Sequence, residues 1–526
     1  MSFRLFLLFA SCLLLAACPS PDPTPTPDPD PEPEPLTGQP WSEGPYGVEI
    51  LDTIEDFTVP TRNGDWSLRD QWTGEDSYVF LHLADGSGYT RQLWDSSLEE
   101  FLEASSENAH YFFVSSLSSW EQDVEVMEVR IDDLLATLDE DDAKHWSTRL
   151  HVVREEVNEL SAPLEPILET WPDAWDADVA GFAIDRFQRL RQLGLLRWPS
   201  GNSSPELSYV SHNTPFFDFE WDREQELAAL NPTTVALTVS AGSGSHEVEL
   251  PSTEVLQSFD RMWIDYSMEC TGHNDANCPD WDRITDLKIC DVADPTVCTE
   301  IGRWITTYKR EGRWFADASP ALAHFQEGGL RTFNIGGPGG NQYTISLHFW
   351  SSGEDAGRPS EIVPLWTGGS FNEDYNANHP PISVTIPADV VKVELFAIIS
   401  GHGWGIEEAN CAEFCNHVHH WRVGEQEWVK DHIEDLGSPG CIGKIDQGVT
   451  PNQYGTWPLG RAGWCPGWEV PPFVADITDA VLPGENLIEY WALYGNQEYV
   501  PEPATFPNNS GFGAQINMNS WLVYSR

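Results

Sequence analysis

The sequence predicts a mainly β protein in which two antiparallel sandwiches or jelly rolls follow an α/β domain. The chain has 526 residues, and at roughly 150 residues per domain this length suggests about three domains. Hydrophobic residues make up 40% and charged residues 21% of the chain, which provides enough apolar surface for packed cores. From about residue 220 onward, short runs of β-branched and aromatic residues are separated by Gly, Pro and Asn, a pattern typical of strands and turns.

The N-terminus predicts export. Arg4 precedes an apolar run over residues 5–17 that is too short to cross a bilayer and is typical of a signal-peptide core. The run ends in Leu-Ala-Ala-Cys18, which resembles the lipobox of bacterial lipoproteins. A plain secretory signal is the alternative. We therefore expect a signal peptide over residues 1–17 and a lipid on Cys18.

A Pro-rich acidic linker over residues 18–40 follows the signal. Proline occupies every second position from 19 to 35, which favours an extended polyproline II spacer of roughly 50 Å at ~3.1 Å per residue. No later apolar run is long enough to cross a membrane. We expect an exported protein that is lipid-anchored to the bacterial cell envelope, at the outer membrane or cell surface, and contacts the membrane through the anchor only.

The charge of the chain limits its partners. The formal net charge is −56, from 84 acidic and 28 basic residues. Such a surplus of acid repels phosphate backbones, so we expect no nucleic-acid partner. It fits a protein kept soluble in brine as well as an ordinary acidic exported protein. We expect a monomer.

The cysteines predict disulfide bonds. Cys12 lies within the signal, and eight cysteines remain beyond Cys18; an even number in an oxidising compartment favours disulfides. They form four local couples, and the simplest assignment is Cys270–Cys278, Cys290–Cys298, Cys411–Cys415 and Cys441–Cys465. Zinc is the rival interpretation, but these spacings do not form the paired C-x₂-C knuckles of zinc sites.

The first folded unit, about residues 41–219, has no cysteine. Strand candidates at 78–83 and 111–114 precede residues 150–160, where apolar residues recur at three- and four-residue intervals and predict a helix. This alternation predicts an α/β domain, and its opening resembles a redoxin of the thioredoxin superfamily. The residues after Leu83 lack the Cys-x-x-Cys of such proteins, and without a thiol the domain cannot exchange disulfides. We expect a docking or structural role.

The remaining chain contains many short strand candidates. The clearest are residues 234–239, 247–250, 344–349, 382–386, 391–399 and 486–494. So many short strands predict antiparallel sandwiches or jelly rolls. Because a single sandwich would be overfilled, we expect two.

Three segments of this region carry unusual residues in a fixed order. They are Cys270 to Cys278 followed by Pro-Asp-Trp281-Asp282-Arg283; Gly302-Arg-Trp-Ile-Thr306; and Ser400-Gly-His402 through Cys411-Ala-Glu413-Phe-Cys415 to Arg461-Ala-Gly-Trp464-Cys465-Pro-Gly. Together they resemble the peptide:N-glycosidase F family, bacterial amidases that remove N-linked glycans from glycoproteins. The likeness covers about residues 220–526.

The resemblance implies both a fold and a reaction. The fold would be two eight-stranded antiparallel jelly rolls side by side, residues 220–369 and 370–526, and three family disulfides match 270–278, 411–415 and 441–465. The reaction would be hydrolysis of the amide between asparagine and the first N-acetylglucosamine of an N-glycoprotein or glycopeptide, with no cofactor. Because the bond is an amide, the carboxylate-spacing rules for glycosidases do not apply.

The resemblance also implies site residues. Asp282 would be the principal catalytic carboxylate, Glu413 would assist it and Arg283 would orient it or the glycan. Trp281, Trp350 and Trp464 would stack on sugars, and Arg461 and His402 would bind substrate. A structural ion pair and core tryptophans are the alternatives. Independently, a Cys411–Cys415 bond would force a tight turn with Glu413 at its tip, since four strand steps span about 13 Å and a disulfide needs Cα atoms within roughly 7 Å.

The pattern departs from the family at several histidines. His348, in Leu347-His-Phe-Trp350, stands where the family has a third active-site glutamate, and His402 replaces a tryptophan. In one account His348 substitutes for the missing acid as a titratable group near neutral pH.

In a second account the cleft binds copper. His417 and His419 alternate by two and leave the same face of a strand, with His420 beside them. The type II copper monooxygenases share the double jelly roll and carry a similar His-x-His with a methionine; Met518 is the only methionine of the second jelly roll, although the first shows no His-His pair for a second copper. A copper-dependent oxidoreductase and a non-catalytic glycan-binding lipoprotein are therefore the alternatives to an amidase.

Overall fold

The computed structural model describes residues 38–526 except 85, 87, 169–178, 195, 197–204, 241–242, 340, 354–356, 405–410, 438–439, 496 and 498–511. The predicted signal peptide, the lipidation site Cys18 and nearly all of the linker lie outside the described residues. Within the described part, no helix is both long and apolar enough to cross a membrane.

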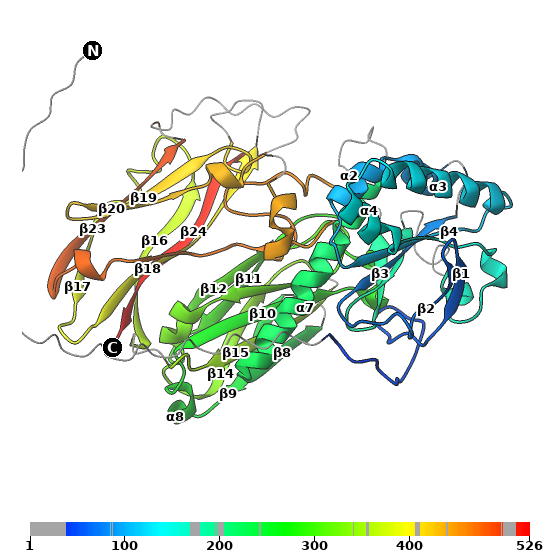
Figure 1. The fold of residues 1–526 in the computed structure, drawn as a ribbon. Helices are drawn as coiled ribbons and strands as arrows, with labels where there is room; N and C mark the ends of the chain where they lie inside the picture. The colour runs from blue at the N-terminus through cyan, green and yellow to red at the C-terminus, as the bar shows by residue number, and fades with distance from the viewer. Residues whose placement is uncertain are drawn as a thin grey trace, which may run out of the picture. The chain divides into compact units, whose positions relative to one another are not determined.

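The N-terminal domain is built on a mixed sheet with strand order β5-β4-β3-β6-β7, in which β3, β4 and β5 are parallel and β6 and β7 antiparallel to their neighbours. A hairpin, β1-β2, precedes it (Figure 1). The strands are β1 (Thr58–Thr61), β2 (Gly64–Ser67), β3 (Ser77–Leu83), β4 (Ala109–Ser115), β5 (Leu150–Val152), β6 (Val179–Ile184) and β7 (Leu190–Gly194). The helices are α1 (Tyr89–Asp95), α2 (Leu98–Glu103), α3 (Trp120–Leu135), α4 (Glu140–Ser147), α6 (Leu207–Ser211) and α7 (Asn213–Leu230).

The central strands β3 and β4 are buried along their whole length, as expected for parallel strands covered on both faces. Val79 and Leu81 point to a core shared with the helices, whereas Tyr78 and Phe80 point to a second core with the β1-β2 hairpin. These two strands confirm the strand predictions for this domain. The α/β arrangement agrees with the sequence, and its kinship to thioredoxin stays a prediction.

The helix predicted for residues 150–160 is wrong. Leu150–Val152 instead form β5, which pairs in parallel with β4, and a short 3-10 helix follows at Val157–Glu159. The apolar spacing arises because Leu150 and Val152 of the strand pack into the core with the helices, whereas Val157 and Leu160 of the following turn pack into the core with the β1-β2 hairpin. A further helix, α7, runs through the domain boundary that we predict after residue 219.

The first jelly roll contains one four-stranded sheet, β13-β10-β15-β8, facing a second sheet, β12-β11-β14-β9. Its strands are β8 (Thr233–Ser240), β9 (Gly244–Leu250), β10 (Arg261–Glu269), β11 (Ile284–Cys290), β12 (Cys298–Ile305), β13 (Gly312–Asp317), β14 (Gly329–Gly336) and β15 (Gln342–Trp350), with a short helix α8 (Thr253–Leu256). Alternate residues of the strands, such as Ile264 and Tyr266 of β10, fill the core between the sheets.

The second jelly roll pairs the sheet β16-β24-β18-β22 with the sheet β17-β23-β19-β20. Its strands are β16 (Pro359–Ser370), β17 (Ile382–Ile386), β18 (Lys392–Trp404), β19 (His417–Val423), β20 (Gln426–Asp431), β22 (Phe473–Asp476), β23 (Gly484–Tyr494) and β24 (Phe512–Ser525). Over the described residues each jelly roll therefore has eight strands, all pairings are antiparallel, and the predicted fold class is confirmed. All six strand candidates of this region are strands.

A short strand from the second half of the chain joins the first jelly roll. β21 (Trp468–Glu469) pairs with the end of β12, with Ile305 opposite Trp468. The segment between β20 and β21 therefore returns to the border of the two jelly rolls. Arg461 and Trp464, in the turn just before β21, are placed at this border.

The two jelly rolls share a buried polar bridge. Arg303 of β12 forms a two-pronged ion pair with Glu300, at 2.7 and 2.8 Å, and its Nη1 donates to Ser400 Oγ and to the Asn517 carbonyl of the second jelly roll, at 2.9 and 2.8 Å. Apolar residues from both jelly rolls, among them Ile305 and Trp521, pack around it. This arginine belongs to the Gly-Arg-Trp-Ile-Thr segment, so one structural role of that motif is to link the two jelly rolls.

All four predicted disulfides are present. The bonds are Cys270–Cys278, Cys290–Cys298, Cys411–Cys415 and Cys441–Cys465. Four disulfides are typical of an exported protein.

Candidate active site

Asp282 lies in the turn between the Cys270–Cys278 ring and strand β11. Thr306, immediately after β12, clamps this turn. The Arg283 N–H donates to Thr306 Oγ1 at 2.8 Å, and that hydroxyl donates to the Trp281 carbonyl at 3.1 Å. The Thr306 N–H closes the ring to the Arg283 carbonyl at 2.9 Å. The backbone on both sides of Asp282 is therefore fixed by the last residue of the motif that bridges the jelly rolls.

Glu413 sits in the ring closed by Cys411–Cys415, whose Cα atoms are 5.5 Å apart. The backbone N–H groups of Ala412 and Glu413 both donate to the Gly403 carbonyl, at 3.0 and 3.1 Å. The Glu413 carbonyl accepts from Ala462 N–H at 2.9 Å. The ring is thus tied to the end of β18 and to the turn that carries Arg461, as a tight disulfide turn predicts.

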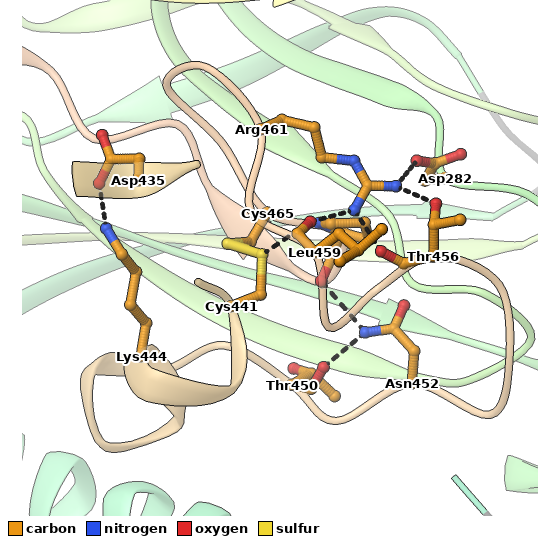
Figure 2. The surroundings of a disulfide bond; sticks show 12 residues. Asp282, Asp435, Cys441, Lys444, Thr450, Asn452, Thr456, Leu459, Arg461 and Cys465 are labelled. Carbon is orange, nitrogen blue, oxygen red and sulfur yellow. Dashed lines mark hydrogen bonds and ion pairs between the residues drawn. A yellow bond between two sulfur atoms is a disulfide. The ribbon is translucent and has the colours of Figure 1, made fainter. Parts of the chain in front are cut away.

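Arg461 joins the two acids, and Figure 2 shows its contact with Asp282. Its guanidinium is fully buried; Nη2 lies 3.4 Å from Asp282 Oδ2 and Nε lies 3.7 Å from Glu413 Oε1. Because both contacts end on one planar group, the two carboxylates lie within about 10 Å of each other. Acids from the two jelly rolls therefore converge on one site.

The guanidinium is held by its own loop. Nη1 donates to the carbonyls of Thr456 and Leu459, both at 2.6 Å, and Nη2 donates to Thr456 Oγ1 at 2.6 Å and to the Tyr308 hydroxyl at 3.3 Å. The Cys441–Cys465 disulfide closes this loop, as Figure 2 shows. Arg461 therefore keeps its position whether or not either acid is ionised.

Burial governs the protonation of both acids. It raises the pKa of Glu413 to about 7, since the opposing effect of Arg461 is only partial and the charge of Asp282 adds to the rise. Burial also raises the pKa of Asp282, against the lowering effects of Arg461 and of a hydrogen bond from Tyr308. One cation faces two acids, so the pair holds about one proton near neutral pH.

Two aromatic side chains border the site and face solvent. Trp281 is 58% exposed and lies edge-on to Tyr308, and Phe414 is 38% exposed, with Arg461 stacked on its ring at 5.1 Å. Exposed aromatic faces beside polar groups are suited to sugar stacking. Of the predicted sugar-stacking residues, Trp281 is the one that lies near the acids and is exposed to solvent.

Two other predicted substrate-binding residues are buried supports. Trp464 packs under Arg461, with the guanidinium 4.9 Å from its ring, and its Nε1 donates to the Gly401 carbonyl. His402 stacks on Trp464 at 5.1 Å and bonds Ser400 Oγ through Nε2 at 2.8 Å. Burial lowers the pKa of His402 to about 3, so the ring is neutral.

Tyr308 is a site residue that the sequence analysis missed. Its hydroxyl contacts Arg461, and burial together with the charge of Asp282 raises its pKa to about 12. Its ring belongs to the core of the N-terminal domain, and Arg310, two residues on, donates from Nη2 to Asn213 Oδ1 of α7 at 2.7 Å. The sequence signal that could have identified Tyr308 as a site residue is its position, two residues after the Gly-Arg-Trp-Ile-Thr segment.

The structure does not bring His348 to the acid pair. Its Nδ1 bonds Thr234 Oγ1 at 2.9 Å and its Nε2 lies 3.5 Å from Asp265 Oδ2. His348 occupies the face of β15 opposite the core residues Leu347 and Phe349. The assignment of His348 as a substitute for the third acid therefore has no support in the geometry.

Two further predicted residues make no contact with the acids that would support their predicted roles. Trp350, also on β15, packs edge-on against Trp263. Arg283 is exposed; its charge lowers the pKa of Asp282, but less than that of Arg461. The orienting role predicted for Arg283 fits the contacts of Arg461 instead.

The two histidines predicted for a metal do lie together. His417 Nδ1 is 2.7 Å from His419 Nε2, and both rings are buried. Met518 of β24 packs in the apolar core of the second jelly roll. The third group that converges on the two rings is His432, just after β20.

Comparisons with known proteins give one family match and several similar solved structures. Residues 370–524 match the family model "Peptide-N-glycosidase F, C terminal". A peptide-N(4)-(N-acetyl-β-D-glucosaminyl) asparagine amidase structure matches at 18% identity and a TM-score of 0.44, over 56% of this chain and 96% of that chain. PNGase F, a glycosylasparaginase from Flavobacterium meningosepticum, matches at 19% identity and a TM-score of 0.42, over the same shares.

A structure of PNGF-II matches at 13% identity and a TM-score of 0.41, over 58% of this chain and 67% of that chain. No curated protein matches the chain. The family match spans nearly all of the predicted second jelly roll, residues 370–526. Residues 370–524 are therefore similar to the C-terminal domain of the peptide-N-glycosidase F family.

Proposed function

We propose that this protein is an amidase that hydrolyses the bond between an asparagine side chain and the first N-acetylglucosamine of an N-glycoprotein. The observation that carries the proposal is the convergence of Asp282 and Glu413 on the buried guanidinium of Arg461. The family match of residues 370–524 supports it. The relatives whose structures are named as amidases give the reaction its substrate class.

The protonation of the pair suits amide hydrolysis. Asp282, as the carboxylate, accepts a proton from water while the water oxygen bonds to the amide carbon. Glu413, with a pKa of about 7, donates its proton to the nitrogen as the C–N bond breaks. The products are an aspartate side chain and a glycosylamine, and the pair ends with its one proton on Asp282.

Arg461 stabilises the two acids and the change in their protonation during the reaction. Its Nε has no hydrogen-bond partner among the described residues and faces Glu413 at 3.7 Å. A buried cation near the reacting amide stabilises negative charge that develops on the carbonyl oxygen. Arg461 is therefore a positioning and electrostatic residue for both acids.

The surroundings suit a glycan attached to a protein. Trp281 and Phe414 offer exposed rings near the acids, and the buried Trp464 packs against Arg461. We assign the sugar-stacking role to Trp281 and propose that the lipid on Cys18 and the Pro-rich linker hold the enzyme at the cell envelope.

The direct test is incubation of the purified chain with a denatured N-glycoprotein in heavy-oxygen water. We expect the glycosylated asparagine to become aspartate carrying one heavy oxygen, read by mass spectrometry of the peptide. Asp282→Asn should lower the rate by about 10²–10⁴-fold. The matched control is Asp280→Asn, two residues away and exposed, which should retain activity.

Two results would contradict the amidase. The first is release of the glycan with asparagine retained or with its first sugar still attached, which would indicate cleavage of a glycosidic bond. The second is an unchanged rate in Asp282→Asn. Glycan binding without any cleavage would favour the glycan-binding alternative.

A further inference from the structure

Three histidines converge in the interior of the second jelly roll. His417 and His419 project from the core face of β19, beside Trp421, and His432 follows β20, the strand paired with β19. Each offers a ring nitrogen, and these nitrogens all lie within 4.8 Å of one another. The three side chains are fully buried. The amidase chemistry proposed above uses none of them.

The rings are turned toward a common point. His417 Nδ1 and His419 Nε2 face each other at 2.7 Å, and the ring of His432 lies edge-on to that of His417, with centroids 4.8 Å apart. Two neutral imidazole nitrogens that both present lone pairs repel at such a distance unless a proton or another cation lies between them. A neutral N–H of one ring can bridge this distance, and so can a cation bound by both nitrogens.

The outer nitrogen of one ring is anchored. His419 Nδ1 bonds the Tyr490 hydroxyl at 2.8 Å, and that hydroxyl bonds the Tyr375 hydroxyl at 2.9 Å. His432 Nδ1 lies 3.5 Å from Asp435 Oδ2 but makes no hydrogen bond with a described residue. Holding the far nitrogen of a histidine fixes which nitrogen faces inward, the arrangement that proteins use to orient metal-binding imidazoles.

Part of the cluster lacks partners within the protein. His417 Nε2 and His432 Nε2 make no hydrogen bond with any described residue. Leaving a buried polar group unpaired costs about 1–3 kcal/mol, so an interior with several such atoms is expected to bind something that pairs them.

We propose that His417, His419 and His432 form a binding site for one transition-metal cation that prefers imidazole ligands. Bonds of about 2.0–2.1 Å to each nitrogen require the nitrogens to lie within about 3.5 Å of one another, so binding draws the His432 ring inward. Imidazole suits copper and zinc better than the hard cations magnesium and calcium.

Charge selects between these two metals. All three ligands are imidazoles, which bind metals in their neutral form, and Asp435, a carboxylate beside His432, is already paired with Lys444 and lies 3.7 Å from Lys430. Burying a divalent ion with neutral ligands costs more than burying a monovalent one. The site therefore favours copper(I) over zinc(II). Because all three ligands are sealed from solvent, the ion stabilises the jelly roll and does not meet an external substrate.

The experiment uses the full chain. Metal content of the purified protein is measured by elemental mass spectrometry, and metal-stripped protein is titrated separately with copper(I), held by a competing chromophoric chelator, and with Zn²⁺. We expect one copper per chain, a higher unfolding temperature with copper(I), and an X-ray absorption edge of a copper ion bound by three nitrogens. One zinc per chain with no affinity for copper(I) would overturn the charge argument. Failure of both metals to bind would overturn the site.

The matched variants lie on one hairpin. His432→Ala should weaken copper(I) binding by more than about tenfold. His420→Ala, on the opposite face of β19, where the ring stacks on Trp491 and bonds Glu427, should bind as the parent does. Equal binding by all three proteins would overturn the proposal. If His432→Ala does not fold, the absorption spectrum of the parent decides, since fewer than three imidazole nitrogens at the ion exclude this site.

Discussion

The acid pair and the three-histidine cluster are two polar groups built on the same stretch of chain, with opposite access to solvent. Glu413 and His417 are four residues apart, and the Cys411–Cys415 ring leads directly into β19. The acids are bordered by the exposed rings of Trp281 and Phe414, whereas the three histidines are fully buried. Burial perturbs the protonation of both groups, but only the acids can act on a molecule from outside.

The largest effect is expected for Arg461→Gln, because this change removes the one cation that faces two buried acids. Breaking a buried ion pair from one side costs about 3–5 kcal/mol. We expect a loss of this size in the free energy of unfolding, measured by urea denaturation, together with loss of amidase activity. Metal binding by the purified folded fraction should persist.

Arg283→Gln is the matched control for Arg461. Arg283 adjoins Asp282 in sequence but is exposed, and exposed charges contribute about 0–1 kcal/mol. We expect less than a tenfold change in rate. A larger loss in Arg283→Gln than in Arg461→Gln would return the orienting role to Arg283 and undo our assignment.

Glu413→Gln should lower the turnover rate by about 10²–10⁴-fold, since glutamine keeps the shape of the side chain and donates no proton. The pH profile sharpens this test. The pKa of Glu413 is raised to about 7, so the acid is protonated below that pH and activity should fall as the pH rises through about 7. Residual activity of the variant should lack this alkaline limb; an unchanged limb would assign it to another group.

Gly401→Ala tests whether the two groups are separable. A Cβ at this position would clash with the Ala412 carbonyl oxygen and with His417 Nε2, so it displaces the Glu413 ring and the histidine cluster together. Overpacking of this kind costs about 1–3 kcal/mol. We expect both amidase activity and copper(I) affinity to fall. Gly513→Ala, where nothing lies within 4 Å of an added Cβ, is the control for a glycine substitution without contact.

The smallest effect is expected for Trp281→Ala. An exposed aromatic platform contributes about 0.5–1.5 kcal/mol to stacking, which corresponds to a rise in KM of about two- to tenfold with kcat nearly unchanged. The unfolding temperature should stay the same, because the ring is 58% exposed. A fall in kcat without a change in KM would place Trp281 in the chemical step and not in sugar binding.

The sequence was sufficient for the fold where signals are local. Strands such as residues 382–386 and 486–494 show through their β-branched residues, and the cysteine couples close short rings that need no knowledge of the fold. Residues 150–160 were mistaken for a helix because a strand end and a following turn bury residues at helix-like spacing. The long-range pairing of Leu150–Val152 with β4 makes the start of that segment a strand.

The site was predictable only in part. Asp282 and Glu413 come from motifs, but their partner Arg461 is 179 residues from Asp282, and proximity in sequence pointed to Arg283 instead. The prediction for His348 rested on its place in the family pattern. On β15 its side chain lies on the face opposite the core and contacts Thr234 and Asp265. His432 was within reach, since a hairpin that turns at Gly424 places Val418 opposite Asp431 and therefore brings the next residue near His417.

The small covalent ring around Glu413 has a consequence for where the protein can work. A cystine loop of five residues, Cys411 to Cys415, holds the carboxylate against its partners, and such bonds are rare in reducing surroundings. A newly made chain still in the reducing cytoplasm would lack the ordered loop. If the proposed amidase is correct, the enzyme would therefore become active only after leaving the cell interior.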